Sequence, residues 1–228
     1  MFLLDSKEMM NFRLLLRMVI KAYKIQFDQI VFASDEAEVQ KNCQTPYKNH
    51  PNGCPNYKNN WSCPPYAPTV QKTQQSLENY RFFWMLVLKT PIPKINTKFL
   101  KKWKIKRVNM RITKTLNNYL SYLQSNHRDW KFYYCSECNL CSEKNYSKCT
   151  CPTDPCRFPN KFRISPEAAG IDVFASLKKI NILIEMDPIT NLQRIGMCAT
   201  DENVDFAVEY KKFENQLSIL NKIDSLGT

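Results

Sequence analysis

The sequence predicts an α+β fold: a small mixed sheet with flanking helices and two cysteine-rich metal-binding loops. Residues 81–89 are a run of aromatic and branched side chains that is typical of a buried strand. Residues 96–124 repeat apolar side chains at helical spacing, which indicates a long amphipathic helix. Nine of the ten cysteines fall in two irregular stretches, 43–68 and 135–159. These stretches carry too few apolar residues to fold by burial alone, so we expect a metal to organise them.

The other elements complete this fold class. Ser165, Pro166 and Glu167 form a helix start, because serine caps, proline suits the first helical position and an acid suits the first turn. The predicted elements are a helix over 7–24, a strand over 27–33, a strand over 131–134, a helix over 165–179, strands over 181–186 and 192–199, and a helix over 205–223. We expect three parts: an N-terminal amphipathic helix (1–26), a cysteine-rich metal-binding domain (27–200) and a C-terminal helical extension (201–228).

Composition excludes several classes of protein. With 43% hydrophobic and 24% charged residues in 228, the chain resembles an ordinary globular protein and not a disordered one. It has only four glycines and no glycine-rich phosphate loop, which argues against a Rossmann or P-loop nucleotide enzyme. No apolar run is long enough to span a bilayer. The oily segment 2–20 is interrupted by charges, unlike a signal peptide, so we expect a cytoplasmic protein whose cysteines are reduced and available as ligands.

The second loop carries the strongest motif, Cys135-x2-Cys138-x2-Cys141. Closely spaced thiolates can curl around one centre, and three in such a run with a distant fourth is a common way to hold a [4Fe–4S] cluster. The same loop continues with three further cysteines: Cys149, Cys151 and Cys156. A structural zinc site more often pairs two separate CxxC or histidine motifs. The spacing therefore favours iron–sulfur, with zinc as the alternative.

The first loop indicates a second metal site. It holds Cys43, Cys54 and Cys63, the last followed by two prolines that fix the chain direction. His50 lies between the first two cysteines and is either a fourth ligand in a Cys3His zinc site or a solvent-facing loop histidine. Cys198 lies apart in an apolar strand and is expected to be a core residue.

These loops resemble domain-of-unknown-function family 2284, a family of predicted metal-binding proteins. The resemblance runs from about residue 27 to 199. The residues that carry it are Gly53-Cys54-Pro55-Asn56-Tyr57, Trp61-Ser62-Cys63-Pro64-Pro65, the CxxCxxC run, Cys156-Arg157-Phe158-Pro159, Arg163-Ile164-Ser165-Pro166-Glu167-Ala168 and Gly170-Ile171-Asp172-Val173-Phe174.

The resemblance implies metal or iron–sulfur binding and supplies no reaction. The positions that match as ligands are Cys54, Cys63, Cys135, Cys138, Cys141 and Cys156, together with Cys43. This chain departs from the family pattern in a longer segment between Cys141 and Cys156, which adds Cys149 and Cys151, and in about 25 extra residues at the C-terminal end. The insertion leaves open which cysteine is the fourth ligand of each site.

Two arginines flank the second loop and are candidate cofactor-binding residues. Arg157 follows Cys156 directly, and Arg163 lies six positions further on. A cluster held by four thiolates is an anion, and a nearby guanidinium raises its reduction potential. The alternative is an ordinary ion pair with Asp154, Glu167 or Asp172.

The net charge of +12 comes from one segment. Residues 79–128 contain no acidic residue but 12 of the 33 basic ones, and the remaining 21 basic residues balance the 21 acidic ones. The basic stretch 89–114 is a solvated helix face, a docking surface for an acidic redox protein or larger complex, or a site for nucleic acid phosphates. Known nucleic-acid-binding signatures are absent from the sequence, so protein docking is favoured over nucleic acid.

The sequence supports three functional hypotheses. The first is an iron–sulfur protein with one or two [4Fe–4S] clusters, acting as an electron carrier or redox accessory subunit. The second is a cluster-dependent enzyme in which three thiolates of the first loop leave one iron open. The third is a zinc-stabilised binding module with a basic face for RNA or an acidic protein. A hydrolytic triad is not indicated, since His50 and His127 are the only two histidines and neither has a catalytic motif around it.

Overall fold

A four-stranded sheet forms the centre of the computed structural model, which describes residues 18–47, 50–92, 98–184 and 190–226. The strand order is β1-β3-β6-β4. The strands are β1 (Val19–Ile25), β3 (Phe82–Pro91), β6 (Asn191–Thr200) and β4 (Lys131–Tyr133). A separate pair joins β2 (Val31–Phe32) to β5 (Ile171–Asp172). The α+β class is confirmed; the sequence predicts a mixed sheet, and the pairs that the structure describes are all antiparallel.

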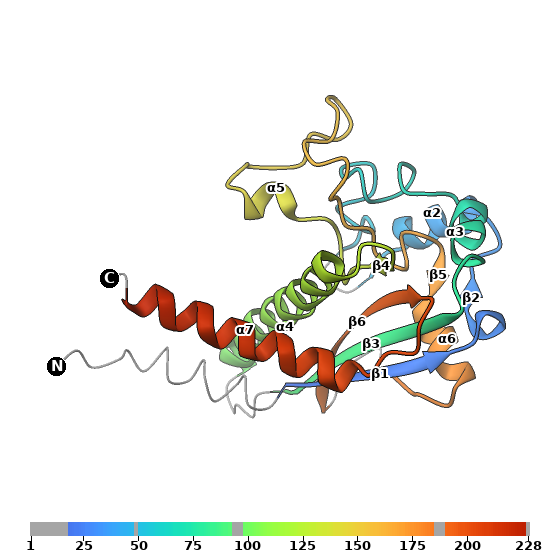
Figure 1. Cartoon of the computed structure of the whole chain (residues 1–228). Helices are drawn as coiled ribbons and strands as arrows, with labels where there is room; N and C mark the ends of the chain where they lie inside the picture. Colours follow the sequence, from blue (N-terminus) through green and yellow to red (C-terminus); the bar gives the residue numbers. More distant parts are fainter. Residues whose placement is uncertain (1–17, 48–49, 93–97, 185–189, 227–228) are drawn as a thin grey trace.

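Two long helices pack together against the sheet (Figure 1). They are α4 (Lys98–Asn126), which contacts β3 and β6, and α7 (Phe206–Leu226), which contacts β1 and α4. The shorter helices are α2 (Glu36–Gln44), α3 (Val70–Leu77), α5 (Leu140–Glu143) and α6 (Val173–Lys179), with a 3-10 turn at Phe27–Gln29. Figure 1 shows the cysteine-rich loop around α5 projecting beyond the end of α4, beside the loop that follows α2.

Strand β3 belongs to two hydrophobic cores at once. Phe83, Met85 and Val87 pack into the core that contains α6 and β5. Trp84 and Leu86 alternate with them and pack against α4 and α7. Because side chains alternate across a strand, a strand that is covered on both faces has a continuous apolar sequence. This double burial explains the uninterrupted apolar run in the sequence.

The predicted helix over 7–24 differs from the structure where residues are described. Residues 19–25 form β1, which pairs along its whole length with β3. As an edge strand, β1 bonds half of its backbone N–H and C=O groups to β3. The stability gained from this pairing outweighs the local preference for a helix that the apolar spacing suggests. The part of that prediction over 7–17 lies outside the described residues.

The helix predicted from Ser165 begins later, at Val173. Ser165 does cap a turn, since its Oγ accepts from the Ala168 N–H at 3.2 Å. The turn ends at Gly170, whose φ of +82° is left-handed and whose missing Cβ would lie 2.7 Å from Val70 Cγ2. The chain then forms β5, and Asp172 caps α6 by accepting from the Ala175 N–H at 2.9 Å.

The strand predicted over 27–33 forms only in part, because Phe27–Gln29 are a 3-10 turn and β2 covers Val31–Phe32. The other elements follow the predictions with two further differences. The strand at 82–91, the helix at 98–126, the strands at 131–133 and 191–200 and the helix at 206–226 lie close to the expected ranges. Residues 181–184 form no strand, and 185–189 lie outside the described part. Sequence reasoning also missed α2 and α3, which are short and polar and depend on caps by Asp35 and Thr69. The three-part division of the chain stays a prediction.

Gly196 provides a test of the close packing between β6 and α4. A Cβ at this position would lie 2.7 Å from Leu120 Cδ1 and 3.1 Å from the Tyr133 carbonyl oxygen. Leu120 is completely buried and has little room to move. We expect Gly196→Ala to lower the free energy of unfolding by about 1–3 kcal/mol, measured by urea denaturation. The exposed Lys21→Ala on β1 should change it by no more than about 0.5 kcal/mol; an equal effect of both would contradict the packing argument.

Candidate metal centre

The second cysteine loop leaves the sheet at the end of β4 and is closed at its base. The Tyr134 N–H donates to the Ile164 carbonyl at 2.7 Å, which brings the start and the end of the loop together. Asn117 of α4 then binds both backbone groups of Cys135, the residue after Tyr134. Its Oδ1 accepts from the Cys135 N–H and its Nδ2 donates to the Cys135 carbonyl, each at 2.9 Å. The loop therefore starts from a fixed point on α4.

Cys135 faces a different environment from the rest of its motif. Its side chain is 4% exposed, and the groups around its sulfur are Arg194, Glu167, Thr113 and the backbone of Ile195. Ser136 has a left-handed φ of 70°, so the chain reverses direction between Cys135 and Cys138. Burial raises the pKa of the Cys135 thiol to about 12 although Arg194 acts in the opposite direction.

The two cysteine loops are joined by a buried polar bridge. Asn60 donates from Nδ2 to the Cys138 carbonyl at 2.9 Å, and Ser62 accepts from the Cys138 N–H at 3.1 Å. The Asn60 Oδ1 also accepts from both the N–H and the Oγ–H of Ser62. Asn60 is 6% and Ser62 1% exposed, so these bonds are shielded from water. The bridge holds the Cys63 and Cys138 regions side by side.

The three cysteines of the first loop lie near one another. The Cys54 N–H donates to the Cys43 carbonyl at 2.7 Å. Gly53 makes this approach possible, because its φ is +79° and a Cβ there would lie 2.5 Å from that carbonyl oxygen. Burial raises the pKa of Cys43 to about 11 and that of Cys63 to about 12, and the neighbouring Cys54 contributes to both shifts. A positive ion would favour the thiolate forms that these surroundings disfavour.

The first-loop cysteines line an open pocket of about 850 Å³, which we call the thiol pocket. Glu137 reaches it from within the second loop and Glu167 from the segment that follows that loop, and both interact electrostatically with first-loop thiols. His50 also lines the pocket, with its ring 4.6 Å from that of Tyr47. The structure thus places the predicted alternative ligand His50 beside the predicted cysteines.

Among the remaining cysteines of the second loop, Cys149 and Cys151 contact the first loop, whereas Cys138 and Cys156 interact with each other. Cys138 and Cys156 interact electrostatically, and the Phe158 N–H donates to the Cys156 sulfur at 3.4 Å. Cys149 donates to Asn60 Oδ1 at 3.9 Å. Cys151 donates to the Lys58 carbonyl at 3.7 Å. Burial raises the pKa values of Cys138 and Cys151, the latter to about 11.

The two predicted cofactor-binding arginines have different surroundings. Arg157 donates from Nη1 to the Cys141 sulfur at 3.6 Å and to the Lys148 carbonyl at 3.0 Å, and its guanidinium lies 4.4 Å from the centre of the Tyr146 ring. Arg163 is 7% exposed and forms an ion pair with Glu143 at 2.8 Å. The structure therefore gives Arg157 a direct contact with the Cys141 sulfur. Arg163 fastens α5 to the loop base, and its backbone and its charge both act to lower the pKa of the Cys138 thiol.

The donor chemistry of these loops fits a metal centre, although the sulfurs are not gathered around one point. Within the described residues, no three cysteine, histidine, aspartate or glutamate side chains form a group able to hold a metal ion. None of the ten cysteines forms a disulfide, so all nine loop thiols are available as ligands. Sulfur-directed donors from Arg157 and the Phe158 N–H are the kind of contacts that surround an iron–sulfur cluster.

Comparison with protein-family models matches residues 23–200 to DUF2284, described as a predicted metal-binding protein. The chain belongs to this family. Neither a curated protein nor a solved structure gave a match. This DUF2284 member therefore shares with its family a predicted metal-binding role, and the matched residues include both cysteine loops. Among the described helices, none has the length and apolar character needed to cross a membrane.

Several residues of the DUF2284 site were missed by sequence reasoning. Asn60, Asn117 and Arg194 act through hydrogen bonds to residues far away in the chain, which no local pattern shows. One signal was present: Asn117 lies next to Leu116 on the apolar side of the α4 pattern, where a buried amide needs a partner.

The bridge predicts different effects for two adjacent asparagines. Asn60→Ala removes the link to Cys138, and we expect it to lower the free energy of unfolding by about 1–3 kcal/mol. Amide hydrogen exchange of residues 135–159 should accelerate in the same variant, because the loop loses its contact with the first loop. The matched control is Asn59→Ala, which removes only an exposed bond from Nδ2 to the Pro55 carbonyl. Equal exchange rates in the two variants would show that the bridge does not couple the loops.

Proposed function

We propose that this chain is an iron–sulfur protein that carries one or two [4Fe–4S] clusters and serves as an electron carrier or redox accessory subunit. The observation that carries the proposal is the buried bridge from Asn60 and Ser62 to Cys138, which brings two cysteine loops together. The Arg157 and Phe158 donors to sulfur support a thiolate-bound metal centre, whose negative charge such contacts stabilise. The preference for iron–sulfur over zinc comes from the CxxCxxC spacing.

The contacts suggest a ligand set for each cluster. We assign Cys138, Cys141 and Cys156 to one cluster, with Cys149 as its fourth ligand because Asn60 contacts both Cys149 and the Cys138 carbonyl. From the sequence, Cys135, Cys138, Cys141 and Cys156 would hold this cluster, and Cys149 or Cys151 would complete the other. The surroundings of the Cys135 sulfur favour another role for that residue. For the other cluster we assign Cys43, Cys54 and Cys63, with Cys151 as the fourth ligand because Cys151 binds the first loop at Lys58.

Metal analysis of cysteine variants tests this proposal. In protein purified without oxygen, Cys138→Ser should lose about four irons and a matching amount of acid-labile sulfide per chain. The matched control is Cys198→Ala, because Cys198 is completely buried in the sheet core and should leave the iron content unchanged. Iron content that does not respond to Cys138→Ser would disprove the assignment. Zinc without sulfide would instead support the zinc-stabilised binding module.

A catalytic version of the same centre is favoured by one observation. The first-loop cysteines line the thiol pocket of about 850 Å³, large enough for a small molecule to reach a bound metal. If Cys151 does not ligate, one iron of that cluster keeps an open position and can act as a Lewis acid. A substrate-dependent change in the cluster's EPR spectrum would support this version, and four-thiolate ligation at both sites would exclude it.

The basic face of α4 is our proposed docking surface for an acidic redox protein. Lys106, Arg107 and Lys114 are exposed on this helix. Trp103 is 49% exposed and its ring lies 4.6 Å from the Arg107 guanidinium, which gives the charged face an apolar contact point. Opposite charge steers association of redox partners and makes it sensitive to salt. The cytoplasmic location expected from the sequence stays a prediction.

Charge reversal tests the docking surface with a small acidic ferredoxin as the probe. Arg107→Glu should slow electron transfer to the ferredoxin several-fold at low ionic strength, because it removes a steering charge. Lys178→Glu, the same kind of change on exposed α6, is the control and should have a smaller effect. Equal effects of both variants would contradict a localised surface. Displacement of the ferredoxin by transfer RNA at lower concentration than by added acidic protein would favour nucleic acid as the partner.

A further inference from the structure

A second pocket, beside the thiol pocket, has a lining suited to a small molecule. It encloses about 460 Å³ between α4, β6 and the segment before β5. Its polar residues are Asn109, Ser136, Glu167, Gln193 and Arg194, and its other lining residues are Cys135, Phe174, Ile184, Leu192 and Ile195. We call it the arginine pocket. Its volume is in the range of pockets that bind small ligands, about 300–1,000 Å³.

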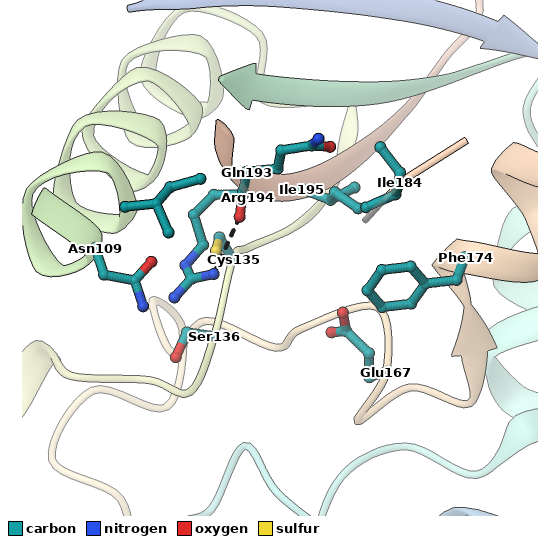
Figure 2. A pocket seen from close by; sticks show the side chains of 10 residues that line it. Asn109, Cys135, Ser136, Glu167, Phe174, Ile184, Gln193, Arg194 and Ile195 are labelled. Carbon is teal, nitrogen blue, oxygen red and sulfur yellow. Dashed lines mark hydrogen bonds between the residues drawn. The ribbon is translucent and has the colours of Figure 1, made fainter. Parts of the chain in front are cut away.

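Arg194 gives this pocket its positive charge. Its Nε donates to Thr113 Oγ1 at 2.9 Å and its Nη1 to the Gln193 carbonyl at 3.0 Å, which fixes the guanidinium in place. Within the described residues it forms no ion pair, and its Nη2 has no hydrogen-bond partner. Figure 2 shows the guanidinium directed toward the open space beside Cys135 and Ser136. The Glu167 carboxyl interacts with this guanidinium electrostatically without forming an ion pair. A guanidinium fixed in this way binds carboxylates and phosphates strongly.

Asn109 provides a second, independent sign of a ligand. Its Oδ1 is buried and has no hydrogen-bond partner within the described residues. Figure 2 shows this amide on the same side of the pocket as Arg194. Buried polar atoms are nearly always hydrogen-bonded, so an unpartnered acceptor at a pocket wall points to a missing donor. The Nδ2 group of the same amide is a donor and can bind a carboxylate.

The opposite wall supplies apolar surface. Figure 2 shows Phe174 and Ile184 across the pocket from Arg194, with Ile195 next to Arg194 on β6 and Glu167 beside the Phe174 ring. A ligand that fits both walls has an anionic group at one end and a short apolar group at the other.

We propose that the arginine pocket binds a small organic carboxylate, with its carboxylate on Arg194 and Asn109 and its apolar group against Phe174, Ile184 and Ile195. This inference goes beyond the iron–sulfur proposal, because all the proposed contacts come from protein side chains and none from a metal. It also gives Cys135 a place outside the cluster, in the wall of a binding pocket.

Equilibrium dialysis of the full chain with radiolabelled phenylacetate tests the proposal. We expect saturable binding of about one phenylacetate per chain, competed by isovalerate and not by the neutral isostere 2-phenylethanol. Arg194→Gln should weaken binding by at least about tenfold, because it removes a charged hydrogen-bond donor. Arg128→Gln, an exposed arginine on the loop after α4, is the control and should bind as the unmodified protein does.

Arg194→Gln also removes the hydrogen bonds from Arg194 to Thr113 and Gln193, so a second variant that keeps Arg194 is needed. Asn109→Asp keeps the side-chain shape but places a negative charge beside the guanidinium, and it should also weaken binding by at least about tenfold. Inorganic phosphate that competes as well as isovalerate would overturn the role of the apolar wall and identify a simple anion site. Absence of saturable binding by either carboxylate, or binding unchanged in Asn109→Asp, would overturn the proposal.

Discussion

The pairing of Asn117 with both backbone groups of Cys135 is the contact on which the functional end of the molecule depends. It connects α4 to the first residue of the second cysteine loop, which lies inside the larger hydrophobic core. The Asn117 side-chain amide bonds to the N–H and the carbonyl of Cys135 as a neighbouring strand would. The hydrogen-bonded part of the chain at β4 is thereby extended as far as Cys135. The next residue, Ser136, then turns the chain through a left-handed conformation. The direction in which the loop leaves the protein is thus set by α4.

In the two cysteine loops, polar contacts hold the chain in place of apolar packing. The two cores contain mainly strands and helices, and Cys135 is the only cysteine of the two loops that belongs to either described core. The loops are held instead by Asn60, Ser62, Arg163 and the Trp61 bond to the Asp154 carbonyl. Each such bond adds only about 0.5–1.5 kcal/mol, or somewhat more where charged. Metal binding and loop order are therefore linked, because ligands on two loops must be ordered together.

Sequence patterns predicted the parts of the fold that apolar periodicity determines. The strand at Phe82–Pro91 and the helix at Lys98–Asn126 both have burial patterns that match their spacing. The patterns failed where one distant contact decides the outcome. Gly170 ends a turn because Val70 lies against it, and residues 19–25 are a strand because β3 offers them a free edge. For the site, the CxxCxxC spacing located the loop but could not show that Ser136 turns Cys135 away from Cys138.

The arginine pocket and the thiol pocket share Ser136, Glu167 and Phe174, so the two are adjacent. Glu167 interacts electrostatically with Cys43 on one side and with Cys135 on the other. The two pockets therefore meet along one wall, so a ligand in either pocket would contact residues that also line the other.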